Sequence, residues 1–162
     1  MDTREKIVSR QGLTAILEEH RRAGRKIVFA NGVFDLLHVG HVRYLESARA
    51  EGDLLVVGIN SDSSTRELKG PGRPILTERA RATLVAALKS VDYVVIFDEF
   101  NVNSLLKELQ PDVHAKGTDY TADTVPEREL AALLGIRVAI VGDPKQHSTR
   151  DLLARLRQPG NA

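Results

Sequence analysis

The chain has 162 residues, of which 42% are hydrophobic and 28% are charged, an ordinary composition for one globular domain. Lys and Arg total 23 and Asp and Glu total 22, so the net charge of +1 argues against a general nucleic-acid-binding surface. The absence of cysteine excludes a disulfide scaffold, a thiolate zinc site and a cysteine nucleophile. No apolar run could span a bilayer and the charged N-terminus lacks a signal-peptide pattern, so we expect a cytoplasmic protein with no membrane partner.

Five short apolar runs rich in β-branched residues alternate with amphipathic helical patterns. A helix is expected at about residues 9–24, where Leu13, Ile16 and Leu17 share one face. Each of the five runs is typical of a strand that is buried on both faces, and they lie at residues 26–30, 54–59, 93–97, 112–115 and 137–141. Helices are expected after the first run and at residues 80–87, 102–109, 130–134 and 152–156. This alternation predicts a doubly wound, Rossmann-like α/β fold: a five-stranded parallel sheet with helices on both faces.

We expect one domain over residues 1–157 and a frayed tail over residues 158–162. The polar stretch 60–74 is expected to be a long functional loop. Ligands of doubly wound sheets bind at the carboxyl ends of the strands, near the switch in strand order. The polar segments that follow the strands are therefore the candidate binding loops.

His38 and His41 stand three positions apart at the expected start of a helix, so they share a face. Gly40 between them lets a ligand approach the backbone, and a helix N-terminus attracts phosphate. Two imidazoles there would stabilise charge that develops on phosphoryl oxygens. The spacing alone also allows a capping histidine beside a core histidine. Zinc ligation is less favoured, because neither an H-E-x-x-H motif nor a cysteine is present, and no side chain is assigned to a metal.

The string F-A-N-G-V-F-D-L-L-H-V-G-H at residues 29–41 resembles the opening strand, loop and helix of the H-x-G-H nucleotidyltransferases, the cytidylyltransferase-like superfamily. Residues 60–70, 116–120 and 147–149 resemble, in order, later blocks of the bacterial heptose 1-phosphate adenylyltransferases, and the likeness covers residues 26–156. Three positions depart from the pattern: Val33 replaces a common Cys, Thr118 replaces a Gly and Arg150 replaces a hydroxyl residue.

The resemblance implies adenylyl transfer from ATP, with Mg²⁺, to a sugar phosphate. The substrate it points to is heptose 1-phosphate, and the products are ADP-heptose and pyrophosphate. Two alternatives stay open: a cytidylyltransferase that acts on glycerol 3-phosphate or a similar alcohol phosphate, and a non-catalytic nucleotide-binding module. The resemblance also implies a homo-oligomer, expected to be a dimer, and a separate sugar kinase that supplies the substrate.

Three residues are expected to act in catalysis: His38 and His41 on the triphosphate, and Lys69 as a cation from the loop. The alternatives that stay open are that Lys69 is a solvated lysine, Asp35 a turn residue and Ser148 a helix cap. For His114, in the fourth expected strand, two positions stay open: packed in the core or lining the site. The further residues expected to bind the nucleotide or the sugar phosphate are Asn31, Gly32, Phe34, Asp35, Gly40, Asn60, Asp62, Arg73, Arg79, Lys116, Gly117, Asp119, His147, Ser148 and Thr149.

Overall fold

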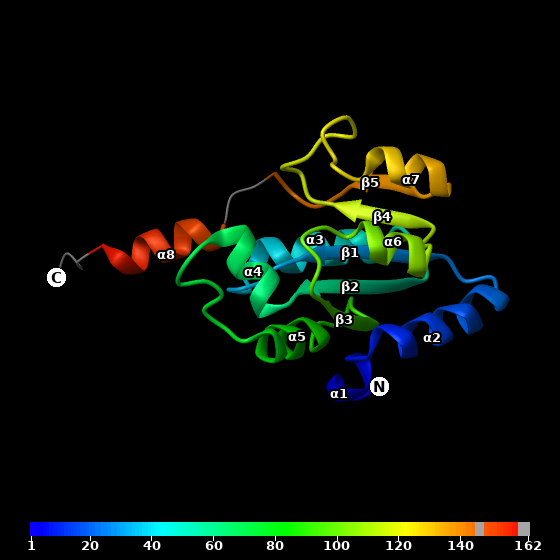
Figure 1. Ribbon diagram of the computed structural model, residues 1–162, viewed down its shortest axis with the longest axis horizontal. Coiled ribbons are helices and arrows are strands. Elements are labelled where there is room, and N and C mark those ends of the chain that lie inside the picture. Colours follow the sequence, from blue (N-terminus) through cyan, green and yellow to red (C-terminus); the bar gives the residue numbers. More distant parts are fainter. Residues whose placement is uncertain (145–147, 159–162) are drawn as a thin grey trace.

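A five-stranded parallel sheet forms the centre of the computed structural model, which describes residues 1–144 and 148–158 (Figure 1). The strand order is β3-β2-β1-β4-β5, so the order reverses between β1 and β4. The five expected strands are confirmed, and their ends differ by at most two residues. They are β1 (Ile27–Gly32), β2 (Leu54–Asn60), β3 (Tyr93–Phe97), β4 (Val113–Lys116) and β5 (Arg137–Ile140).

Helices cover both faces of the sheet, which confirms the doubly wound prediction. One face packs against α3 (Val39–Arg49) and α5 (Glu78–Ala86), and α1 (Thr3–Lys6) contacts α5. The other face packs against α2 (Arg10–Arg22), α6 (Asn103–Leu109) and α7 (Arg128–Leu134). The two remaining described helices, α4 (Asp62–Lys69) and α8 (Thr149–Arg157), lie on the side where the strands end (Figure 1).

Residues of the continuous apolar runs contribute to two separate hydrophobic cores, one on each face of the sheet. In β1, Val28 and Ala30 belong to the core under α3 and α5, whereas Ile27 and Phe29 belong to the core under α2 and α6. Successive side chains of a strand point to opposite faces, so a strand covered on both sides needs an apolar residue at every position. All seven residues of β2 are buried for this reason.

The stretch 60–74 is not the long loop that we expected, because it contains α4. Ser61 caps this helix by accepting a hydrogen bond from the Ser64 amide, and the residues it buries are Ser64 and Thr65. A helix that buries hydroxyl groups has no apolar periodicity, and periodicity is the main signal from which a helix is predicted. The loop expectation failed for that reason.

The first expected helix is confirmed as α2. Ser9 caps its start by accepting a hydrogen bond from the Gly12 amide, and Gly24 follows its end with a φ of 72°. Of the expected tail at 158–162, only Gln158 lies in the described part, and the domain limits stay a prediction. Within the described ranges, no helix has both the length and the hydropathy that a membrane span requires.

Candidate active site

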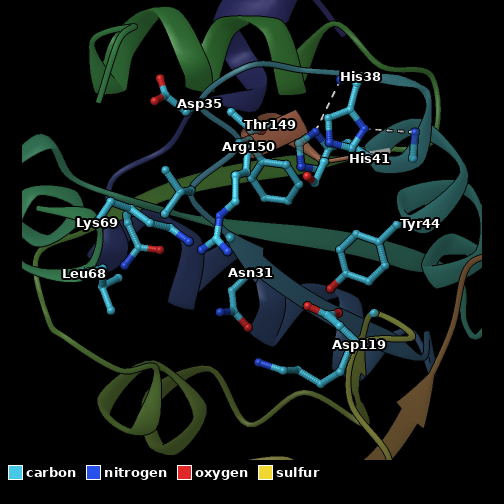
Figure 2. A pocket seen from close by; sticks show the side chains of 18 of the residues that line it. Asn31, Asp35, His38, His41, Tyr44, Leu68, Lys69, Asp119, Thr149 and Arg150 are labelled. Atoms are coloured by element: carbon cyan, nitrogen blue, oxygen red, sulfur yellow. Dashed lines mark hydrogen bonds between the residues drawn. The ribbon is translucent and has the colours of Figure 1, made fainter. Parts of the chain in front are cut away.

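A cavity of about 1160 Å³ opens at the carboxyl ends of the strands, beside the switch between β1 and β4 (Figure 2). Sites for one small ligand usually measure roughly 300–1,000 Å³, so this cavity has room for two substrates. The strand-end loops bring most of the predicted site residues to its wall. These are Asn31, Gly32, Phe34, Asp35, His38, Gly40, His41, Asn60, Lys69, Arg73, Lys116, Gly117, Asp119, Ser148 and Thr149.

Two of the predicted residues do not reach the cavity wall. Asp62 pairs with Arg81 at 2.8 Å, and Arg79 is exposed on α5. A third, His147, lies outside the described residues.

His38 and His41 cap the start of α3 reciprocally. The Gly40 amide donates to Nδ1 of His38 at 3.1 Å, and the His38 amide donates to Nδ1 of His41 at 3.3 Å (Figure 2). Their rings stack with centroids 3.8 Å apart. Because each Nδ1 accepts a hydrogen bond, the proton of each neutral ring is on Nε2. Both imidazoles therefore have an N–H donor at Nε2, on the side of the ring away from the capping hydrogen bond. Each histidine can cap the helix through Nδ1 and still offer Nε2–H to a phosphate.

Phe34 packs against His41 of this histidine pair. Its side chain is 4% exposed and its ring meets that of His41 edge-on, with centroids 5.1 Å apart. Phe34 has a φ of 51°, a conformation that costs a non-glycine residue roughly 1–2 kcal/mol. A Cβ on Gly32 would lie 2.9 Å from the Phe34 ring, so the ring can take this place only beside a glycine. The N-G-V-F segment thus places the Phe34 ring against His41.

Asp35 holds two loops together. Its carboxylate is 1% exposed and accepts hydrogen bonds from Nε of Arg73 at 2.6 Å and from the amides of Ile75 and Leu76 at 2.9 and 3.0 Å. Burial opposes ionisation, but the two amides and the guanidinium outweigh it and lower the pKa of Asp35. These partners occupy the carboxylate, so the structure favours the loop-stabilising interpretation over a contact with sugar or Mg²⁺. Arg73 is held in the same pair.

Lys116 also has a partner inside the protein. It is 7% exposed, its Nζ lies 3.6 Å from Oε2 of Glu127, and the same Nζ lies 4.7 Å from the centre of the Tyr120 ring. The positive charge of Lys116 is therefore balanced by a buried carboxylate. Next to it, a Cβ on Gly117 would lie 3.0 Å from the Asp119 carboxylate, so a larger residue there would require that side chain to shift.

The residues at the start of α8 combine capping with a position on the cavity wall. Ser148 caps the helix by accepting from the Asp151 amide at 3.1 Å, which confirms the capping interpretation. Thr149 donates to the Leu36 carbonyl at 3.3 Å and so joins α8 to the loop after β1. Lys69 is the last residue of α4 rather than part of a loop.

Sequence reasoning missed the residue that joins the site loops most tightly. Arg81 on α5 is fully buried and donates to the carbonyls of Val33, Asn60 and Leu76 at 2.7, 2.8 and 3.0 Å. A buried arginine gives no periodic signal, because arginine is usually exposed. Leu68 and Arg150 also line the cavity (Figure 2), and the departure at Arg150 from the family pattern was the available hint.

Tyr44 on α3 is another wall residue, which the sequence would suggest as a core or edge aromatic. Its hydroxyl donates to the Ala115 carbonyl at 2.8 Å, which joins α3 to β4. Burial raises the pKa of this hydroxyl, so it stays protonated and keeps its donor. His114, in β4, is fully buried and contacts the site through Asn31.

A known protein family matches the part of the chain that forms this site. The model of the cytidylyltransferase-like family matches residues 29–152, which include the histidine pair and the loops around the cavity. This chain belongs to the cytidylyltransferase-like family. As a member of this family, the protein is a nucleotidyltransferase.

Two relatives of this cytidylyltransferase-like chain share the name bifunctional protein HldE. The one from Syntrophotalea carbinolica is 49% identical over 93% of this chain, and the one from Pelobacter propionicus is 47% identical over 96%. This chain spans 31% and 32% of their respective lengths. A solved structure, the lipopolysaccharide core biosynthesis protein from Thermoplasma volcanium, matches with a TM-score of 0.65 and 31% identity, over 75% of this chain and all of that one.

Proposed function

We propose that this nucleotidyltransferase moves AMP from ATP to heptose 1-phosphate and forms ADP-heptose and pyrophosphate. The observation that carries the proposal is the stacked pair His38 and His41 at the start of α3, on the wall of a cavity with room for a nucleotide and a sugar phosphate. The choice of a heptose is supported by the sequence blocks shared with heptose 1-phosphate adenylyltransferases. The name of the Thermoplasma relative, a lipopolysaccharide core biosynthesis protein, points to the same substrate class.

The reaction needs no protein nucleophile. An oxygen of the sugar phosphate bonds to the α-phosphorus of ATP, the bond from that phosphorus to the bridging oxygen breaks, and the electron pair leaves with pyrophosphate. A phosphate monoester is largely ionised at neutral pH, since its second pKa is about 6, so no side chain has to remove a proton. The protein contributes position and charge stabilisation. His38 and His41 donate from Nε2 to the triphosphate, and Lys69 adds a cation.

The side chains of the cavity fit a Mg²⁺ that arrives with the triphosphate. Among the described residues, no three His, Asp or Glu side chains gather into a metal site, and Asp35 is already occupied by Arg73. Mg²⁺ commonly keeps several waters and takes one or two carboxylates besides substrate phosphates, and Asp119 on the cavity wall is the carboxylate that would hold it here. The ion would neutralise charge on the leaving phosphates. The sugar phosphate itself would come from a sugar kinase.

A pyrophosphate-release assay tests the substrates. The protein is incubated with Mg²⁺, with ATP, CTP, GTP or UTP, and with heptose 1-phosphate, glycerol 3-phosphate or other phosphates. We expect the fastest release with ATP and heptose 1-phosphate. Release only with CTP and glycerol 3-phosphate would replace the proposal with the cytidylyltransferase alternative. No release with any pair would favour a nucleotide-binding module.

Substitution of the histidines tests the site. His38→Asn keeps a side-chain acceptor for the helix cap but removes the Nε2 donor. We expect this variant and His41→Asn to lower kcat by about 10²–10³, the usual effect of losing one preorganised donor. His20→Asn on α2 is the control and should keep wild-type turnover. A loss of less than about threefold in both site variants would contradict the assignment.

A further inference from the structure

His114 lies next to the candidate active site but does not line it. It stands in β4 beside Phe29 of β1, with ring centroids 5.7 Å apart, and it is fully buried. Its Nε2 lies 3.0 Å from Oδ1 of Asn31, which lines the cavity at the end of β1. The mechanism above gives this buried imidazole no part.

The surroundings of His114 keep it neutral. Burial, together with the smaller effect of the Lys116 ammonium two residues along the same strand, lowers its pKa to about 3. A neutral imidazole has one N–H and one acceptor nitrogen, so the proton is on either Nε2 or Nδ1.

The hydrogen bond selects Nε2. A carboxamide oxygen only accepts, so the atom that faces Oδ1 of Asn31 must donate. Nδ1 has no hydrogen-bond partner within the part of the chain that the structure describes. A proton on Nδ1 would therefore be a buried unpaired donor, which is the more costly arrangement of the two.

This choice of tautomer determines how Asn31 is turned. The oxygen and the nitrogen of a carboxamide lie on opposite sides of one planar group. With Oδ1 held against His114, the NH₂ group is directed to the other side, and Figure 2 shows the Asn31 side chain on the cavity wall between Arg150 and Asp119. An NH₂ group donates two hydrogen bonds, and phosphate oxygens only accept. A turned carboxamide would instead present an acceptor to an anion.

We propose that His114 is a positioning residue for nucleotidyl transfer: its Nε2–H holds Oδ1 of Asn31, so that the Asn31 NH₂ group donates to a phosphate oxygen of the bound nucleotide. The inference rests on the proposed function for the identity of the ligand, a nucleoside triphosphate. It adds a residue from the core of the sheet that acts on the ligand only through its neighbour.

A set of four variants tests the coupling. His114→Leu puts an apolar side chain of similar bulk in place of the imidazole and removes the Nε2–H donor. His114→Gln restores an N–H near the place of Nε2. Asn31→Ala and the double variant His114→Leu with Asn31→Ala complete the cycle. Calorimetry with MgATP gives the dissociation constant of each protein, and thermal unfolding shows that each is folded.

We expect His114→Leu and Asn31→Ala each to weaken MgATP binding by about tenfold, the scale of one hydrogen bond to a charged group. His114→Gln should stay within about threefold of the wild type, and the double variant should bind no more weakly than Asn31→Ala alone. Unchanged binding in a folded His114→Leu or Asn31→Ala protein would overturn the inference. Fully additive losses would do the same, because they would show that the two residues act independently.

NMR of the ring nitrogens tests the tautomer without any substrate. We expect ¹⁵N shifts of an Nε2-protonated His114 that change in Asn31→Ala, and protonation at Nδ1 would refute the inference. The two proposals also fail separately. If the wild type releases no pyrophosphate from any pair but the variants show the coupling in MgATP affinity, the proposed reaction is wrong and the positioning of Asn31 stands.

Discussion

Arg81 is the residue on which the geometry of the strand-end loops depends. Its guanidinium is fully buried and bonds three carbonyl oxygens and the Asp62 carboxylate. The carbonyls belong to the loop after β1, the end of β2 and the segment before α5. A planar fork with five N–H donors satisfies several acceptors in different directions, which a lysine ammonium on a flexible stem cannot reproduce.

Replacing Arg81 should therefore destabilise the whole protein. Arg81→Met fills a similar volume but leaves three carbonyls and the carboxylate of Asp62 without their donor. We expect a loss of about 3–5 kcal/mol in the free energy of unfolding, the range measured when one partner of a buried pair is removed. Urea unfolding measures it, with the exposed neighbour Arg79→Met as a control that should change by less than about 0.5 kcal/mol. Equal effects of the two substitutions would contradict this role.

At the scale of elements, Asp35 connects two segments that are about forty residues apart. It joins the loop between β1 and α3 to the segment that leads into α5, through Arg73 and the amides of Ile75 and Leu76. These hydrogen bonds end on an ionised carboxylate, which makes them stronger than bonds between neutral groups. The loop that carries Phe34 toward His41 is held by the same connection.

Asp35→Asn should weaken that connection, because the new NH₂ group faces donors instead of accepting from them. We expect a loss of about 1.5–3 kcal/mol in the free energy of unfolding at neutral pH. The lowered pKa of Asp35 means that its stabilisation is present above its ordinary pKa of 3.8 and is lost below it. The difference between variant and wild type should therefore shrink in acid. Asp123→Asn, at an exposed carboxylate, is the control and should show no such difference.

At the scale of the whole molecule, burial of His114 between two layers makes global stability depend on pH. The unfolded chain takes up a proton at His114 near the ordinary pKa of 6.5, whereas the folded protein takes it up only near 3. The unfolded state binds more protons between these values, so the free energy of unfolding falls as the pH decreases from 6.5. One proton contributes at most about 1.4 kcal/mol per pH unit.

His114→Leu should flatten this dependence. Urea unfolding of wild type and variant between pH 6.5 and about pH 5 isolates the histidine, since Asp35 and Glu99, whose pKa values are lowered, titrate at more acid pH. We expect a smaller slope of stability against pH in the variant. Identical slopes would show that His114 is as easily protonated in the folded protein as in the unfolded chain.

The expected dimer and the expected cytoplasmic location stay predictions. Light scattering of the protein in solution measures its mass and so tests the dimer.

The sequence by itself determined the strands, the helices of apolar periodicity, the doubly wound class and the histidine pair. Strands buried on both faces need unbroken apolar runs, and the H-V-G-H segment must follow the first strand to cap the next helix. These are local properties, written within a few neighbouring residues. For the same reason most of the site residues that the sequence predicted line the cavity.

Tertiary structure alone decided which charged residues are paired with one another. Asp35 pairs with Arg73, Asp62 with Arg81 and Lys116 with Glu127. Each ion pair joins residues that are eleven or more positions apart in the sequence. From the sequence, Asp35, Asp62, Arg73 and Lys116 looked suited to a ligand, because composition does not show which charges become partners once the loops converge. The helix α4 and the contact of His114 with Asn31 belong to the same class: they depend on packing between segments, and no short stretch of sequence contains that information.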